Sequence, residues 1–130
     1  QALSGLPADS IRWICEDARK FIAREVRRGA RYDGIILDPP QFGRGSKGEV
    51  WKLFDDLPLL LADCAKLLDK DSSFMMLTAY SIRASYLSLH GLMQQECAHL
   101  GGSVNSGELA VQEQSAGRML GTALFSRWQA

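Results

Sequence analysis

The sequence predicts an α/β fold in which a parallel sheet is closed by an antiparallel hairpin. Short apolar runs typical of buried strands alternate with apolar stripes at helical spacing. Residues 35–37 read Ile-Ile-Leu, a continuous apolar run expected of a strand that helices cover on both faces. The last two expected strands, 107–113 and 122–128, follow each other without a helix between them, which predicts the closing hairpin.

The expected elements follow the order β-α-β-α-β-α-β-β along the chain. Asp17 is a typical N-cap for the first helix, and Gly29 is a typical helix end. Pro58 lies inside the second helical stripe, where a kink or a division into two helices is expected near residues 54–57. We expect strands over 11–15, 35–37, 74–77, 107–113 and 122–128, helices over 18–26, 50–68 and 85–100, a glycine-containing loop over 41–48, and a helix end in 1–7.

Length and composition narrow the class of protein. The 130 residues are enough for one domain. The net charge of +0 gives no overall attraction to nucleic acid or membranes, although a local basic patch is still compatible with it.

Cys15, Cys64 and Cys97 show no metal-site spacing, so buried free thiols in a reducing cytoplasm are expected rather than disulfides or zinc. His90 and His99 lie nine residues apart on a helix and are not a ligand pair, and no apolar run is long enough to span a membrane. We therefore expect a cytoplasmic protein without a metal or membrane partner.

The first candidate site follows the Ile-Ile-Leu strand directly. Asp38 ends this strand, and Pro39 and Pro40 prevent its continuation. In open α/β sheets ligands bind at the carboxyl ends of the strands. A carboxylate there can accept hydrogen bonds from an amine, the two prolines present carbonyls without N–H groups, and Phe42 can stack on a planar base. The structural alternative is that Asp38 caps the next loop or pairs with an arginine, and that Phe42 belongs to the core.

A second acid occupies a similar position. Asp17 follows the first expected strand and precedes Ala18 at a helix start, so it is either an N-cap or a contact to a ligand across the strand ends. The glycine-containing stretch 43–48 lacks the GxxxxGK[ST] spacing, which argues against a nucleoside triphosphate site. Its cations, Arg44 and Lys47, either contact a phosphate backbone or belong to a plain flexible loop.

The ordered set of motifs resembles a known family. Residues 38–42, Asp-Pro-Pro-Gln-Phe, resemble motif IV of class I S-adenosylmethionine-dependent methyltransferases that act on amino groups of bases. With the following Gly-Arg-Gly and long helix, the segment is most similar to large-subunit ribosomal RNA methyltransferases. Residues 11–18 resemble motif III of that family, 74–81 its strand-five motif, and 1–6 the helix end before strand three. The resemblance implies strands three to seven of a Rossmann-like three-layer sandwich, incomplete, closed by an antiparallel C-terminal hairpin.

The resemblance also implies a cofactor, a substrate and roles for residues. The cofactor would be S-adenosylmethionine, and the acceptor a nitrogen of a nucleobase in ribosomal RNA, oriented by the Asp38 carboxylate and the Pro39 carbonyl. Relatives that methylate carbon five of a pyrimidine use a cysteine after strand five, whereas residues 78–81 read Thr-Ala-Tyr-Ser, so direct transfer to nitrogen fits better. The implied residues are Asp17, Ala18 and Asp38 for the cofactor, Asp38, Pro39, Pro40 and Phe42 for catalysis, and Phe42, Arg44, Lys47 and Tyr80 for the RNA substrate.

Two parts of the family pattern are absent. The sequence contains neither the glycine-rich loop after strand one nor the acid after strand two that would hold the cofactor's ribose. Residues 1–130 are therefore expected to be the C-terminal part of a catalytic domain that lacks strands one and two and binds the cofactor poorly alone. Two alternatives remain open: a methyltransferase acting on a small molecule or protein, which the neutral charge slightly favours, and a non-catalytic α/β interaction domain.

Overall fold

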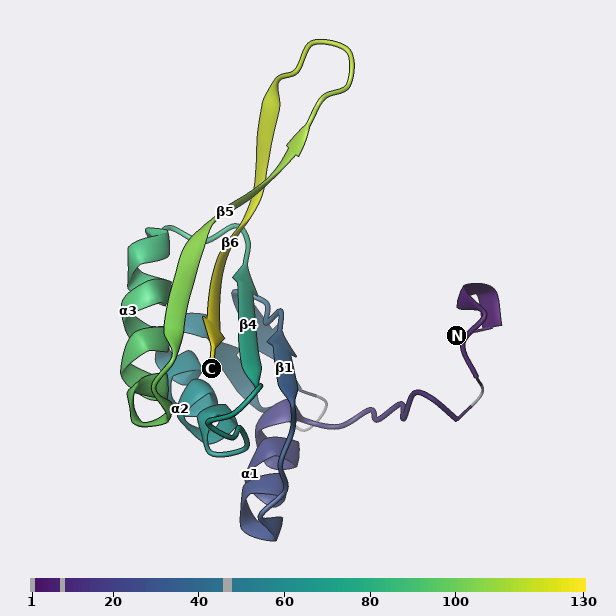
Figure 1. Cartoon of the computed structure of the whole chain (residues 1–130), viewed down its shortest axis with the longest axis vertical. Helices are drawn as coiled ribbons and strands as arrows, with labels where there is room; N and C mark the ends of the chain where they lie inside the picture. Colours follow the sequence, from purple (N-terminus) through teal and green to yellow (C-terminus); the bar gives the residue numbers. More distant parts are fainter. Residues whose placement is uncertain (1, 8, 46–47) are drawn as a thin grey trace.

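The computed structural model describes residues 2–7, 9–45 and 48–130 (Figure 1). Four strands form a sheet in the order β1-β4-β6-β5, in which β1 is parallel to β4, and β6 is antiparallel to both β4 and β5. Strands β2 and β3 form a separate two-stranded sheet. The elements are η1 (Ala2–Ser4), α1 (Ala18–Arg28), β1 (Gly34–Leu37), β2 (Phe42–Arg44), β3 (Val50–Lys52), α2 (Leu53–Ala65), β4 (Phe74–Ala79), α3 (Tyr86–Cys97), η2 (Ala98–Leu100), β5 (Ser103–Gln112) and β6 (Met119–Gln129).

The core lies between one face of the sheet and the helices α2 and α3 (Figure 1). Alternate residues of a strand point to opposite faces. In β4, Met75 and Leu77 are fully buried on the helix side, whereas Phe74 and Met76 lie on the other face and are partly exposed. The described residues therefore form two layers, and they do not form the third layer of the expected sandwich.

The closing hairpin is confirmed. β6 pairs with β4 only through residues 124–129, while its pairing with β5 continues to Met119. The β5–β6 hairpin consequently extends well beyond the four-stranded sheet, as Figure 1 shows. Its tip carries an ion pair between Glu113 and Arg118, 2.6 Å apart.

The expected strand over residues 11–15 is wrong. These residues form no strand, and the N-terminal segment leads away from the body of the molecule (Figure 1). Trp13 is 75% exposed, and Cys15 is exposed rather than buried, in contrast to Cys64 and Cys97, which are buried free thiols as expected. A strand requires a hydrogen-bonded neighbour, and no described strand lies beside this segment.

The segment between β1 and the second helix also differs from the expectation. Part of the expected loop 41–48 is strand β2, and Val50–Lys52 pairs with it as β3 instead of beginning the helix. Helix α2 then runs as one element through Pro58. A proline in the second turn of a helix removes a single backbone hydrogen bond, and the burial of Leu57 and other apolar residues before and after Pro58 offsets this loss.

The remaining elements agree with the expected order. α1 and β4 are each two residues longer than expected, and α3 begins after its N-cap Ser85 and ends at Cys97. The expected helix end within residues 1–7 is only the 3₁₀ turn Ala2–Ser4. No helix in the described ranges is long and apolar enough to cross a membrane.

Candidate functional site

A cavity of about 540 Å³ lies at the carboxyl end of β1, bounded by the start of α1 and by the β2–β3 hairpin. This volume is in the range of small-molecule and cofactor sites. The Gly29 turn reverses the chain after α1, and the short connection to β1 places the helix start beside the end of that strand. The cavity brings together most of the residues expected at the site, namely Asp17, Ala18, Asp38, Pro39, Pro40 and Arg44.

Two of the expected substrate residues lie outside this cavity. Phe42 is 53% exposed and is not part of the core, so the interpretation of Phe42 as a core residue is wrong. Tyr80 is half exposed and lines a separate hollow of about 220 Å³ that Glu108 also lines. Lys47 lies outside the described residues.

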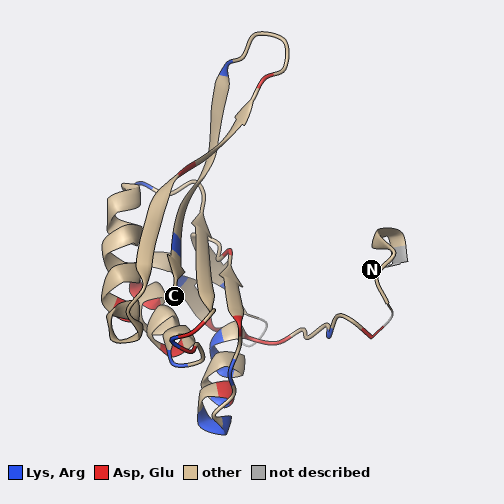
Figure 2. Ribbon diagram, viewed as in Figure 1, with Lys and Arg blue, Asp and Glu red and all other residues tan. Residues whose placement is uncertain are grey.

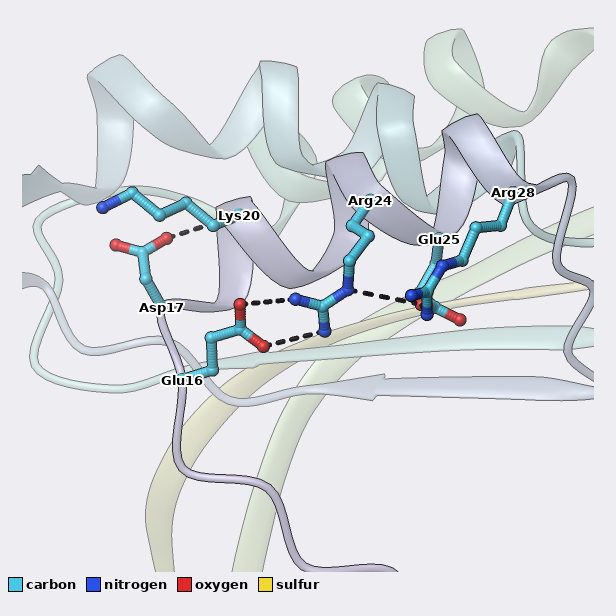
Figure 3. A network of polar contacts seen from close by, with 6 residues as sticks. All are labelled: Glu16, Asp17, Lys20, Arg24, Glu25 and Arg28. Atoms are coloured by element: carbon cyan, nitrogen blue, oxygen red, sulfur yellow. Dashed lines mark hydrogen bonds and ion pairs between the residues drawn. The ribbon is translucent and has the colours of Figure 1, made fainter.

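Asp17 is the N-cap of α1 and also lies at the cavity. Its carboxylate accepts a hydrogen bond from the backbone N–H of Lys20 at 3.0 Å, which makes it the N-cap of α1, and it also lines the cavity. The neighbouring Glu16 accepts two hydrogen bonds from Arg24 at 2.7 and 2.8 Å (Figure 3). These bonds lower the pKa of the Glu16 carboxyl and raise that of Arg24.

Ion pairs hold α1 to the elements on the other side of the cavity. Lys20 contacts Glu49 at 2.7 Å, and this hydrogen-bonded carboxylate raises the pKa of Lys20. Arg19 contacts Asp56 of α2 at 2.6 Å. Figure 2 shows the mixed charges of α1, several of whose cations are engaged by acids. Arg44, in contrast, makes no ion pair with any described residue and lines the cavity.

Three hydrogen bonds hold Asp38 and the turn that follows it. The Thr78 hydroxyl lies 2.5 Å from Asp38 Oδ1, so Asp38 pairs with a hydroxyl and not with an arginine. The Trp51 indole N–H donates to the Pro40 carbonyl at 2.7 Å. The Leu53 backbone N–H donates to the Gln41 carbonyl at 3.0 Å.

Sequence patterns did not indicate these supporting residues. Thr78 could have been found from strand pairing, because the parallel register aligns Leu37 with Leu77 and so places the next residues, Asp38 and Thr78, side by side. Trp51 was expected in the helix over residues 50–68. The pairing of β3 with β2 instead brings its indole toward the Pro39–Pro40 turn.

No protein-family model and no curated protein sequence matches this chain. Among solved structures, the S-adenosylmethionine-dependent methyltransferase from Agrobacterium tumefaciens is 54% identical with a TM-score of 0.92 and aligns with 99% of this chain. SMU.776, a candidate methyltransferase with SAH bound, is 17% identical over 96% of the chain with a TM-score of 0.61. A precorrin-8w decarboxylase from Methanobacterium thermoautotrophicum is 15% identical over 99% of the chain, with a TM-score of 0.57.

These similarities define the fold as the Rossmann-like fold of class I methyltransferases. The chain spans 43% of the length of the Agrobacterium protein, 33% of SMU.776 and 59% of the decarboxylase. The decarboxylase shows that the fold alone does not determine the reaction.

Proposed function

We propose that this chain carries part of the catalytic site of an S-adenosylmethionine-dependent methyltransferase, whose acceptor is an amino nitrogen of a nucleobase in ribosomal RNA. The observation that carries the proposal is that Asp17 and Asp38, acids from two separate segments, line one cavity at the carboxyl end of β1. The Agrobacterium protein, 54% identical to this chain, is an S-adenosylmethionine-dependent methyltransferase, which supports this choice of cofactor.

In this proposal the two acids have different partners. Asp17 and Ala18 would contact the adenine of the cofactor, and Asp38 would lie between the cofactor and the acceptor. When bound, the cofactor supplies the methyl group. The second oxygen of Asp38 and the carbonyl of Pro39 accept hydrogen bonds from the acceptor amine, which aligns its lone pair with the methyl carbon and stabilises the positive charge that develops on nitrogen.

The β2–β3 hairpin supports a nucleic-acid acceptor. Phe42 and Arg44 alternate with Gly43 along β2 and so lie on one face of the hairpin, which is exposed at both positions. An exposed aromatic ring beside a cation suits a stacked base and its phosphate. Lys47 and Tyr80 are further substrate contacts in this proposal, Tyr80 from outside the cavity.

A small molecule or a protein side chain is the second candidate acceptor. The specific observation in its favour is the pairing of cations near the cavity: Arg19, Lys20 and Arg24 are all engaged by acids. An RNA-binding surface usually presents its cations to the phosphates instead. Under this candidate, Arg44 binds a carboxylate or phosphate of the smaller acceptor.

We further propose that residues 1–130 form the C-terminal part of a larger catalytic domain. Among the residues that the structure describes, β1 pairs with β4 on one edge and with no strand on the other, and Ile36 on this strand is 72% exposed. Exposed apolar strands with a free edge are usually covered by further structure. The remaining cofactor contacts would then come from outside this chain.

The test is a methyl-transfer assay with the full-length protein and S-adenosylmethionine carrying a tritiated methyl group. We expect transfer to unmethylated ribosomal RNA, and mass spectrometry of the digested RNA should locate the label on a base amino group. Label found only in small molecules or protein would establish the second candidate. Absence of transfer to all three classes of acceptor would contradict the proposed function.

A further inference from the structure

We propose that Thr78 and Trp51 are positioning residues that together fix the Asp38–Pro40 turn in its catalytic conformation. This inference rests on the proposed function and goes beyond it. The proposed function gives Thr78 and Trp51 no contact with the cofactor or with the acceptor. Both act through other groups: Thr78 through the Asp38 carboxylate, and Trp51 through the Pro40 carbonyl.

Thr78 determines the orientation of the carboxylate. A threonine hydroxyl has one proton, and its oxygen lies 2.5 Å from Asp38 Oδ1 but 3.4 Å from the Leu37 carbonyl, so the proton is directed to the carboxylate. Asp38 itself is exposed, and without this bond its side chain would be free to rotate. Thr78 is half-buried on β4, where the strand pairing holds its backbone.

Trp51 determines the orientation of the backbone. Pro39 and Pro40 have no N–H, so their turn lacks the backbone donors that usually hold a loop. The indole N–H of Trp51 supplies a donor to the Pro40 carbonyl from the neighbouring hairpin at 2.7 Å. Trp51 is half-buried and packs against the core, which gives the indole a defined position.

The two bonds leave a defined pair of acceptors open. Oδ1 of Asp38 is bonded to Thr78, and the Pro40 carbonyl is bonded to Trp51. The second Asp38 oxygen and the Pro39 carbonyl have no hydrogen-bond partner among the described residues. An amine with two N–H bonds can donate one hydrogen bond to each of these two acceptors. Loss of either positioning bond should therefore impair the alignment of the acceptor more than the affinity for the cofactor.

The experiment compares Thr78→Val, Thr78→Ser, Trp51→Phe and wild type in the full-length protein, with tritiated S-adenosylmethionine and its best acceptor. Valine keeps the size of threonine and loses the hydroxyl, serine keeps the hydroxyl, and phenylalanine keeps an aromatic ring without the N–H. We expect Thr78→Val and Trp51→Phe to lower kcat about 10-fold or more, because small misplacements of reacting groups have effects of this size. Thr78→Ser should keep kcat within about 3-fold of wild type. The Kd of S-adenosylhomocysteine should change little in all three variants, and the loss of one hydrogen bond should lower the Tm measurably without unfolding the protein at the assay temperature.

A normal kcat in Thr78→Val or Trp51→Phe overturns the positioning role. So does a kcat that is as low in Thr78→Ser as in Thr78→Val. A loss of kcat that is matched by parallel losses of Tm and of cofactor affinity also overturns it. A wild-type protein that transfers no methyl group overturns the proposed function instead. In that case urea unfolding of Thr78→Val, Asp38→Ala and the double variant decides whether the contact exists. Non-additive shifts of the midpoint support it, and additive shifts overturn it.

Discussion

Asp17 and Asp38 lie 21 positions apart in the sequence and line the same cavity of about 540 Å³. The two acids are held differently. Asp17 is bonded to the backbone at the start of α1, whereas Asp38 is bonded to a side chain of the neighbouring strand β4. Their separate supports allow one acid to be altered without moving the other.

Substitutions of Asp17 should separate helix capping from cofactor binding. Asp17→Ala removes both the cap and the charge, and should destabilise the protein by about 1 kcal/mol. Asp17→Ser retains an N-cap hydroxyl, so it should restore the free energy of unfolding while the affinity for S-adenosylhomocysteine stays reduced. Calorimetric titration and urea unfolding of the full-length protein measure the two effects. If serine restores cofactor affinity as well, Asp17 acts only as a cap.

The ion pair between Glu16 and Arg24 should make the free energy of unfolding depend on pH in the acidic range. The pKa of Glu16 is lowered in the folded chain, so its contribution is fully present above its ordinary value of 4.5 and is lost as the pH falls through the folded pKa below that. Glu16→Gln should therefore lower the urea midpoint at neutral pH, and this difference from wild type should shrink as the pH falls below 4.5 through the folded pKa of Glu16.

The matched control for this pH effect is Glu108→Gln, because Glu108 makes no ion pair with any described residue. It should change the midpoint little at neutral or acidic pH. Both partners of the Glu16–Arg24 pair are reachable by solvent, so about 1 M salt should also reduce the Glu16→Gln effect. A difference that does not shrink anywhere in the acidic range where the protein stays folded would rule out the ion pair as its cause.

The three cysteines should differ in reactivity. Burial raises the pKa of the Cys64 thiol to about 12 and that of Cys97 to about 11, whereas Cys15 is exposed. In the native 130-residue chain, a thiol reagent at mildly alkaline pH should react rapidly with Cys15 alone, and with Cys64 and Cys97 only after unfolding. Cys15→Ser should abolish the rapid phase. Rapid reaction of more than one thiol would contradict the burial of the other two.

The two buried thiols should also make the free energy of unfolding depend on pH in the alkaline range. In the unfolded chain both thiols ionise near their ordinary value of 9.0, but in the folded chain they ionise only at about 12 and about 11. The unfolded chain therefore loses protons first, and the free energy of unfolding should fall as the pH rises from about 9. The double variant Cys64→Ala and Cys97→Ala should show a flatter decrease, measured by urea unfolding across that range.

The sheet could be predicted from sequence because its signals are local. The Ile-Ile-Leu run, the double proline and the absence of a helix between the last two strands each depend on a few adjacent residues, and the structure confirms β1 and the β5–β6 hairpin. The strand predicted over residues 11–15 shows the limit of such signals. An apolar run has strand character only when another strand is present to pair with it.

The same limit applies to the site. Asp17, Asp38 and Arg44 were predicted from their places at segment ends, and the structure brings them to one cavity. Thr78, Trp51 and Glu49 were not predicted as site residues, because their positions there depend on contacts with residues 11 to 40 positions away in the chain. Tyr80 was assigned to the site from its strand end, but it lines a different hollow.

The most direct test of the central claim is the effect of Asp38→Ala on the full-length protein, measured as methyl transfer and cofactor affinity side by side. We predict that transfer falls by about 100-fold or more, because the acceptor amine loses its principal hydrogen-bond acceptor, while the Kd of S-adenosylhomocysteine changes less than about 10-fold. Unchanged turnover in Asp38→Ala, with the cofactor still bound, would contradict the role assigned to Asp38 and with it the proposed site.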